Sequence, residues 1–288
     1  PKDKLSSIRG AIGEMLLRMN CVHDRQCEKC DFESECIVQK ILYSKFVNKP
    51  EFVTTGGSIG YVLECENFRE VFKAGDRLRF YLILFGYTII YFNQIYQALS
   101  MLAKEGIGKN HAKFQIADIK DMEGTSFLDG EMINMSNYAA HMLYDYLVFR
   151  RMKMGGTFDK KEAAMIFDSP VTLKFQKEYL NNFRADAIIS AVRRRIYMLD
   201  CFEGIESDIL KSGEDDVKLK IRSQECYIKS VARYSTRKEQ KIILRGMKGY
   251  LILEGLTEEL WALLLIGELI HIGKNTSFGF GRYHLKCL

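Results

Sequence analysis

Four cysteines lie close together near the amino terminus, at a spacing that suits a metal ion. In NCVHDRQCEKCDFESEC they form a C-x5-C-x2-C-x5-C arrangement. The central C-x2-C aims two thiolates from one short turn, and the outer pair completes a set of four sulfur ligands. Such a set predicts zinc, with an iron–sulfur cluster as the alternative because it uses the same ligands. The predicted ligands are Cys21, Cys27, Cys30 and Cys36.

A second interpretation of this loop is four reduced thiols at the surface, and His23 inside it is either a substitute ligand or an exposed side chain. Because four thiolates leave no open coordination position, the predicted metal is structural and not catalytic. A secreted disulfide scaffold is usually short and spreads its cysteines, whereas four of the eight here form one local cluster and the other four are scattered at unremarkable positions. With no run of eighteen apolar residues and no signal-peptide pattern, the sequence predicts a cytoplasmic protein without a membrane partner.

The segment HIGKNTSFGFGRY, residues 271–283, gathers glycines, hydroxyls, aromatics and cations just before the carboxy terminus. Glycines let a main chain approach a phosphate without a Cβ in the way. A P-loop is excluded, because Asn275 follows the lysine and the expected order of elements is helix, loop, strand. A plain helix-to-strand connection explains the glycines but not Lys274, Asn275, Arg282 and Tyr283 together, whereas contact with phosphate and sugar explains them all.

Basic side chains are concentrated in the second half of the chain. The net charge of +5 permits an anionic partner without requiring one. A solvated face explains any one of the late cations, but their interleaving with tyrosine and glycine favours a nucleic-acid surface. They are Arg193, Arg194, Arg195, Arg233, Arg237, Lys238, Lys241, Arg245, Lys248, Lys274 and Arg282.

The helices and strands that must position these groups are predicted in a similar order in both halves of the chain. In the second half, apolar residues recur with the period of strands and of amphipathic helices, and the order is β-α-β-β-α-β. This is the order of a ferredoxin-like domain. Trp261 falls in its second, very apolar helix and is expected in the core. The predicted elements are strand 164–175, helix 183–202, strands 224–235 and 240–255, a helix from 257 to a stop at Gly273, and strand 277–288.

The first half has the same order of predicted elements, except that the first strand is missing. A strand lost from the amino terminus explains both the missing element and the missing methionine, since the chain starts at Pro1. Within the segment that joins the two halves, residues 137–152 have the composition of a helix. The other predicted elements are helix 6–19, strands 60–66 and 76–86, helix 87–106 and strand 111–121.

We therefore expect an α+β protein of two tandem ferredoxin-like βαββαβ domains, with a small cysteine-rich insertion after the first helix. The amino-terminal domain is expected over 1–121, with its insertion at 21–36. A connecting segment follows over 122–160, and the carboxy-terminal domain with the glycine-rich loop spans 161–288. This fold serves many functions, so it decides none by itself.

Stretches at both ends of the chain resemble the CRISPR-associated endoribonucleases of the Cas-six family, which are RAMP proteins. Near the carboxy terminus the resemblance is carried by VARYSTRKEQK, RGMKGYLILEG and LLLIGELIHIGKNTSFGFGRY. At the other end it is carried by RGAIGEMLLRMNCVHDRQCEKCDFESEC, and EGIGKNHAKFQI at 105–116 agrees with it. The resemblance implies two ferredoxin-like domains side by side, binding of precursor CRISPR RNA, and one cut per repeat without a catalytic metal.

The implied chemistry uses the 2′-hydroxyl of the RNA as nucleophile, so the enzyme supplies a base, an acid and positive charge at the phosphate. The products are then a 2′,3′-cyclic phosphate and a 5′-hydroxyl. Many relatives have a histidine base on or near the first helix, where this chain has Glu14. The catalytic candidates are therefore Glu14, His23 and, beside the glycine-rich loop, His271. The other histidines, His111, His141 and His284, are expected at the surface or in packing.

The partner implied by the resemblance is CRISPR repeat RNA or crRNA, with other Cas proteins of an effector complex as further partners. Glu14 in place of a histidine favours a second hypothesis, a non-catalytic crRNA-binding RAMP subunit. A third hypothesis is a zinc- or iron–sulfur-containing nucleic-acid-binding protein unrelated to CRISPR. The expected RNA contacts are Arg9, Arg233, Arg237, Gly273, Lys274, Asn275, Thr276, Ser277, Gly279, Gly281, Arg282 and Tyr283.

Overall fold

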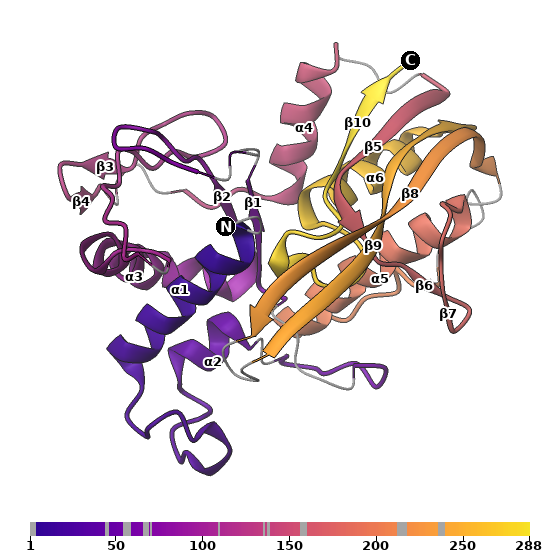
Figure 1. The fold of residues 1–288 in the computed structure, drawn as a ribbon. Coiled ribbons are helices and arrows are strands. Elements are labelled where there is room, and N and C mark those ends of the chain that lie inside the picture. Colours follow the sequence, from indigo (N-terminus) through magenta and orange to yellow (C-terminus); the bar gives the residue numbers. More distant parts are fainter. Residues whose placement is uncertain are drawn as a thin grey trace.

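The structure is a computed structural model, and it shows two α+β halves side by side (Figure 1). This arrangement confirms the predicted fold class. No helix in the part of the chain that the structure describes is long and apolar enough to cross a bilayer. The described residues are 4–43, 46–53, 59–65, 69, 71–108, 110–134, 136, 139–155, 160–211, 218–235 and 240–288.

The carboxy-terminal half is a complete ferredoxin-like domain. Its antiparallel sheet has the strand order β10-β5-β9-β8, and helices α5 and α6 pack against each other beside it. Apolar residues at helical and strand spacing meet in one core that contains Phe167, Ile188 and Trp261. The elements are β5 (Glu162–Val171), α5 (Ala185–Glu203), β8 (Lys220–Ser235), β9 (Gln240–Glu254), α6 (Glu258–Ile270) and β10 (Tyr283–Cys287).

Helix α6 shows why local sequence signals worked well here. Thr257 caps its start by accepting a hydrogen bond from the Leu260 amide at 3.2 Å, and two glutamates stand in the first turn. Trp261 is fully buried as predicted, and its indole N–H donates to the Lys160 carbonyl at 2.7 Å. The final strand begins later than predicted, because Thr276–Phe278 forms a short 3-10 helix, η5, before it.

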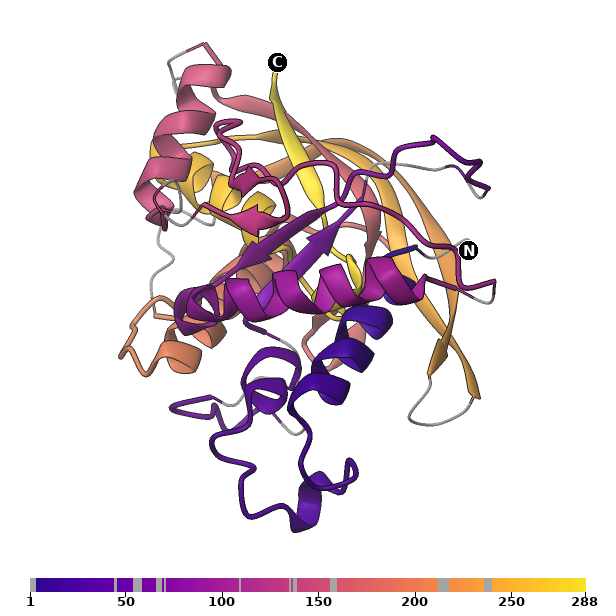
Figure 2. The same cartoon turned by 90° about the vertical axis from the view of Figure 1, so that its left-hand side faces the viewer.

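In the described part of the amino-terminal half, two strands are paired. β1 and β2 are antiparallel, and α1 packs against α3 beside them, as the view in Figure 2 shows. Ile12, Leu16 and Ile95 lie in their shared core, to which the short helix α2 contributes Val38. The elements are α1 (Lys4–Asn20), η1 (Cys27–Lys29), α2 (Ile37–Leu42), β1 (Tyr61–Glu64), β2 (Tyr81–Leu84), η2 (Gly86–Tyr91) and α3 (Phe92–Glu105).

The prediction of a strand over 111–121 was wrong. This segment is extended, and among the described residues its bridges are the isolated pairs Ile107–Ala112 and Lys120–Ser126. In a ferredoxin-like sheet the last strand pairs with the first one, as β10 pairs with β5 in the other half. In the described part of the amino-terminal half no such first strand precedes α1, so no described strand lies beside this segment.

The segment between the halves contains a short hairpin and the expected helix. The helix, α4, packs on α6, where Arg150 and Glu268 form a half-buried ion pair at 2.8 Å. A second short hairpin, formed by β6 and β7, follows β5. The bounds are β3 (Leu128–Asp129), β4 (Met132–Ile133), α4 (Leu143–Lys153), β6 (Lys174–Phe175) and β7 (Glu178–Tyr179).

Candidate nucleic-acid interface

Two arginines from opposite ends of the chain stack on one aromatic ring of the glycine-rich loop. The guanidinium carbons of Arg9 and Arg233 lie 4.4 Å and 4.1 Å from the ring centre of Phe278. Arg9 comes from α1 and Arg233 from β8, whose hairpin with β9 extends toward α1 in Figure 1. Such cation–π stacking fixes the planes of both guanidinium groups, which are the side chains best suited to phosphate. Two predicted RNA contacts thus meet at the predicted loop.

The β8–β9 hairpin adds further positive charge to this side of the molecule. Over residues 226–248 the sequence contains seven Lys or Arg side chains and one acid. Lys229, Lys241 and Arg245 are exposed on it. The register pairs Arg233 with Ile242 and Lys229 with Gly246, so Arg233 and Lys229 share one face. Arg237, a predicted RNA contact, lies outside the described residues.

Lys274, at the start of the glycine-rich loop, contacts Tyr179 of β7. Its ammonium group donates to the phenol oxygen at 2.7 Å and lies 4.9 Å from the ring centre. Lys174 is a second cation near the same ring, at 5.8 Å. The hydrogen bond from Lys274, together with its charge, lowers the pKa of Tyr179 below its ordinary value of 10.0. Tyr179 is exposed, so one ring carries two cations at the edge of the loop.

Most of the glycine-rich loop faces the protein instead of solvent. Gly279 and Gly281 have left-handed φ values of 79° and 75°. A Cβ at Gly279 would collide with Leu5 of α1, and one at Gly281 with the Ile272 carbonyl. These two glycines therefore allow close packing, at Gly279 across the two halves. Only Gly273 and Lys274 are exposed, Asn275, Phe278 and Arg282 are half-buried, and Thr276, Ser277, Gly279, Gly281 and Tyr283 are buried.

The last predicted RNA contacts, Arg282 and Tyr283, make internal contacts. The Arg282 guanidinium lies 3.1 Å from the carboxylate of Glu64 on β1. The Tyr283 hydroxyl donates to the Leu264 carbonyl within the core. Arg195, from the predicted basic run, is also buried, and it donates to the carbonyls of Ile270 and Ile59. Burial lowers its pKa to about 10.

His271 is fully buried between the two halves. One ring nitrogen, Nδ1, donates to the Phe280 carbonyl at 3.2 Å, and Nε2 lies 2.9 Å from the Glu64 carboxylate. Its φ of 57° is strained for a residue with a Cβ, and the two side-chain hydrogen bonds hold it there. Burial opposes ionisation of Glu64, but the hydrogen bond and charge of His271 and the charge of Arg282 outweigh it and lower the Glu64 pKa. The imidazole therefore joins the two halves.

Glu14 is engaged in ion pairs on α1. Arg25 and Arg18 donate to its carboxylate at 2.6 Å and 3.0 Å, and the hydrogen bond from Arg25 is the main reason that its pKa is lowered from 4.5. Glu14 follows Arg9 by five residues, which turns it about 140° around the helix from the Phe278 stack. His23 is exposed, two residues before Arg25, so the loop that carries it is tied to Glu14.

The four clustered cysteines are free thiols in this structure, each half-buried. The Arg25 amide donates to the Cys21 sulfur at 3.2 Å. Among the described residues no group of three or more His, Cys, Asp or Glu side chains is arranged to hold a metal ion. The sulfur atoms are therefore not gathered into a ligand set here, and zinc stays a prediction.

Three residues of the site were not singled out from the sequence. Phe278 was inside the quoted motif, and its position between glycines in a basic loop was the available signal. Tyr179 lies in the two-residue strand β7, which has no distinctive sequence pattern, and Glu64 meets His271 across 207 positions of chain. No local spacing indicates the last two contacts.

The structure thus has a four-stranded ferredoxin-like sheet, with a glycine-rich loop before its last strand, beside a second half of related order. Comparison with protein families adds two matches, each over part of the chain. Residues 165–283 match the family of the CRISPR-associated endoribonuclease Cas6, and residues 1–142 match a family described only as an N-terminal domain. The chain therefore contains a Cas6 domain, and the resemblance found in its sequence is confirmed. No curated protein matches it.

Solved structures share the fold at low sequence identity. A Cas6 product complex aligns with a TM-score of 0.58 at 14% identity, over 99% of this chain and 94% of that one. Thermus thermophilus Cas6 aligns with a TM-score of 0.52 at 12% identity, over 99% and 92%. A partial Cas6-RT-Cas1–Cas2 complex aligns with 0.53 at 16% identity, over 80% of this chain and 39% of that one. This chain thus spans well under half of that longer polypeptide.

Proposed function

We propose that the protein binds CRISPR repeat RNA on the surface where Arg9, Arg233 and Lys274 meet the glycine-rich loop, and that it cleaves this RNA. The observation that carries the proposal is the stacking of arginines from both halves on Phe278. An RNA strand that crosses this point contacts cations of both halves at once. The Cas6 match over residues 165–283 supports the same substrate class.

The proposed cleavage is metal-independent attack by the 2′-hydroxyl on the adjacent phosphate. A base removes the hydroxyl proton, an acid protonates the leaving 5′-oxygen, and cations stabilise the charge on the phosphate. Of the three base candidates, His271 is buried and Glu14 has a lowered pKa, whereas His23 is exposed. A base must be able to reach the 2′-hydroxyl of a bound RNA, so we propose the exposed His23 for this role.

One pair of RNAs tests this function. The protein is incubated in EDTA with a repeat RNA and with the same RNA carrying a single 2′-deoxy sugar at the cut position. We expect cleavage of the first RNA to a 2′,3′-cyclic phosphate and no cleavage of the second. His23→Ala should slow single-turnover cleavage at least about 100-fold with unchanged RNA affinity, and Glu14→Gln should have a smaller effect.

A second candidate is a crRNA-binding subunit that does not cut. Two observations favour it: Glu14 is held by two arginines, and it points away from the Phe278 stack. Tight binding of both RNAs without cleavage of either would reject the nuclease and leave this candidate. Other Cas proteins are the proposed further partners, since the aligned complex is described as an assembly of Cas6-RT-Cas1 with Cas2.

We also propose that the cysteine loop takes up one structural zinc ion, with an iron–sulfur cluster as the alternative. Elemental analysis of the purified protein should find about one equivalent of zinc per chain, lost in Cys27→Ser/Cys30→Ser and kept in Cys65→Ser. Less than about half an equivalent of zinc or iron would reject a four-thiolate site. The cleavage proposed above is metal-independent, so this zinc ion has no part in it.

A further inference from the structure

The four-stranded sheet of the carboxy-terminal half has one covered face and one open face. Helices α5 and α6 cover the face that lies to the rear in Figure 1, where Phe167, Leu251 and Leu253 are at most 1% exposed. Side chains alternate between the two faces of a strand, so the residues next to these point the other way. On the open face, Tyr250 of β9 is 43% exposed and Tyr227 of β8 is 49% exposed. Two tyrosine rings thus face solvent on one sheet.

The strand register places these tyrosines beside a lysine. Tyr227 lies opposite Lys248, and Tyr250 is two residues further along β9 on the same face. Directly opposed residues have Cβ atoms about 4.5–5.5 Å apart, so the three side chains are close neighbours. The half-buried Ile166 of β5 lies opposite Tyr250 and forms the apolar border of this group. We call Tyr227, Lys248 and Tyr250 the tyrosine platform.

The tyrosine platform is continuous with the candidate nucleic-acid interface. Along β8, Tyr227, Lys229 and Arg233 share one face, because residues an even number of positions apart point to the same side. Arg233 is the residue of β8 that stacks on Phe278. The span from Arg233 to Tyr227 is about 20 Å, since a strand rises roughly 3.3 Å per residue. The exposed Lys229 lies between them, so one line of cations leads from the Phe278 ring to the platform.

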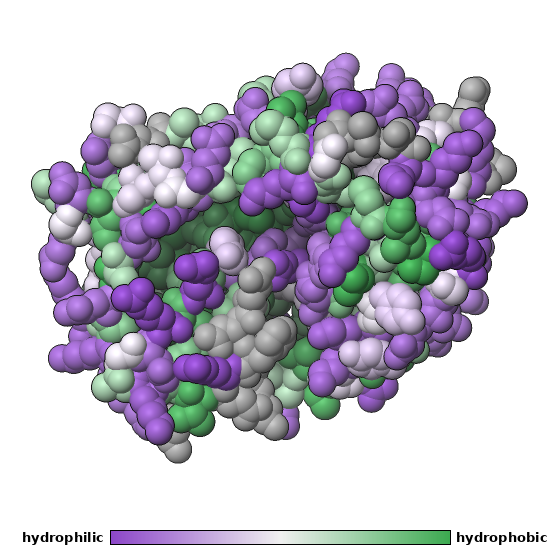
Figure 3. All heavy atoms as spheres, turned by 90° about the horizontal axis from the view of Figure 1, so that it is seen from above, coloured by the Kyte–Doolittle hydropathy of each residue, from purple (hydrophilic) through white to green (hydrophobic). Residues whose placement is uncertain are grey.

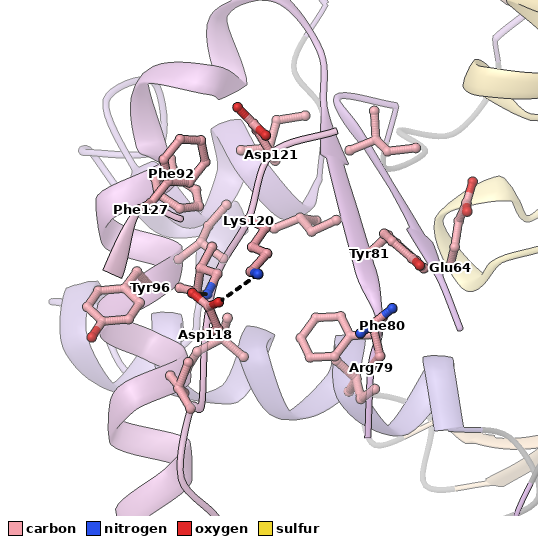
Figure 4. Close-up of a pocket in the computed structure, with 18 of the residues that line it drawn as sticks. Glu64, Arg79, Phe80, Tyr81, Phe92, Tyr96, Asp118, Lys120, Asp121 and Phe127 are labelled. Carbon is pink, nitrogen blue, oxygen red and sulfur yellow. Dashed lines mark hydrogen bonds and ion pairs between the residues drawn. The ribbon is translucent and has the colours of Figure 1, made fainter. Parts of the chain in front are cut away.

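Charge distinguishes this line from the largest hollow of the molecule, a groove beside β2 with a volume of about 4050 Å³. Figure 3 shows the hollow with an apolar floor and a polar rim. Its lining contains nine Lys or Arg and nine Asp or Glu side chains, and in Figure 4 Lys120 pairs there with Asp118, at 3.3 Å. The β8–β9 hairpin, with seven cations and one acid over residues 226–248, is therefore the surface that attracts a polyanion.

An aromatic ring beside a cation suits a single strand of nucleic acid. Unpaired bases stack on aromatic side chains while cations follow the phosphates. The bases of a double-stranded stem are already stacked on one another, and proteins recognise such a stem mainly by its shape and its backbone. The tyrosine platform therefore suits unpaired nucleotides better than a stem.

We propose that unpaired nucleotides of the repeat RNA run from the Phe278 stack along β8 to the tyrosine platform, where bases stack on Tyr227 and Tyr250. Lys229 and Lys248 contact the phosphates of this stretch. The path rests on the proposed function, since the same RNA is held at Phe278. Because every base has a flat aromatic face, the platform holds the strand without reading its sequence.

Equilibrium binding of a repeat RNA with about eight unpaired nucleotides tests the platform. Tyr227→Ala/Tyr250→Ala should bind this RNA at least about tenfold more weakly than the parent protein, because two stacked bases lose their partners. Tyr227→Phe/Tyr250→Phe keeps both rings and should bind within about twofold of the parent. Tyr144→Ala removes an equally exposed tyrosine from α4 and should also bind like the parent. All three variants should keep the melting temperature of the parent, since the side chains are exposed.

Cross-linking identifies the contact directly. RNAs that carry one 5-iodouridine at successive unpaired positions are irradiated on the parent protein, and we expect adducts at Tyr227 or Tyr250. Parent-like affinity of the alanine double variant would overturn the platform and leave RNA binding at Phe278 intact. Adducts confined to groove residues such as Phe80 and Phe114 would also overturn it, and would place the unpaired strand beside β2. A parent protein that bound no repeat RNA would reject the proposed function and this path together.

Discussion

An Arg9→Ala/Arg233→Ala double variant should bind repeat RNA about 100-fold more weakly than the parent protein, since a hydrogen bond to a charged group contributes about 1.5 kcal/mol. Both guanidinium groups are fixed on the Phe278 ring, so each meets a phosphate with little further loss of side-chain freedom. Removal of two phosphate contacts should also reduce the slope of log affinity against log salt by about 1.4 for a single-stranded RNA. Titrations at several salt concentrations measure both quantities.

The matched control for this variant is Arg222→Ala. Arg222 is also on β8, but it is paired with Glu162 at 2.7 Å near the other end of the strand. Its removal should change the affinity less than about threefold, because an exposed ion pair of this kind contributes little. Phe278→Leu keeps both charges but loses the aromatic face, so it should show an intermediate loss of affinity. If the double variant and the Arg222 control bound RNA with equal affinity, the RNA-binding surface would have to lie elsewhere on the protein.

Sequence patterns predicted the carboxy-terminal half almost completely, because each of its elements has its own apolar period and its own start or stop. Helix α6 has a threonine cap, and α5 has a regular apolar stripe that ends at Gly204. The same method failed over 111–121, whose apolar alternation is that of a strand. Alternation reports which face of a segment would be buried, but a strand also requires a neighbour for its backbone. Among the described residues of the amino-terminal half, no strand pairs with this segment.

The sequence predicted which residues gather at the candidate site more successfully than it predicted what each of them does there. Arg9 and Arg233 were selected from separate stretches of sequence, and the fold brings both to Phe278. The glycines of the loop were expected to expose amides to phosphate, whereas Gly279 and Gly281 serve close packing. Composition cannot distinguish these roles, because both require the absence of a Cβ. The distinction depends on which surface lies against the loop.

His271 gives the clearest case of such a change in role, and Glu64→Ala tests it. The variant should lower the free energy of unfolding by about 3 kcal/mol, since removal of one partner from a buried ion pair leaves the other charge uncompensated. Here it removes the Glu64 carboxylate from both the His271 imidazole and the Arg282 guanidinium, although Arg282 keeps Asp168 at 4.0 Å. The melting temperature should fall by about 6–12 °C. Glu35→Ala, which removes an exposed pair with Lys40, should cost less than about 1 kcal/mol.

The cost of Glu64→Ala should depend on pH in a definite direction. The Glu64 pKa is lower in the folded protein than its ordinary value of 4.5, so the unfolded chain binds its proton more readily. The stability that Glu64 contributes is therefore fully present above pH 4.5, and it is lost as the pH falls through the folded-state value. Urea unfolding of the parent and the variant should give a smaller difference at about pH 3 than at about pH 5. A difference that stayed the same at low pH would show that Glu64 acts in its neutral form, as a hydrogen-bonding group between the halves and not as the charge that holds His271 and Arg282.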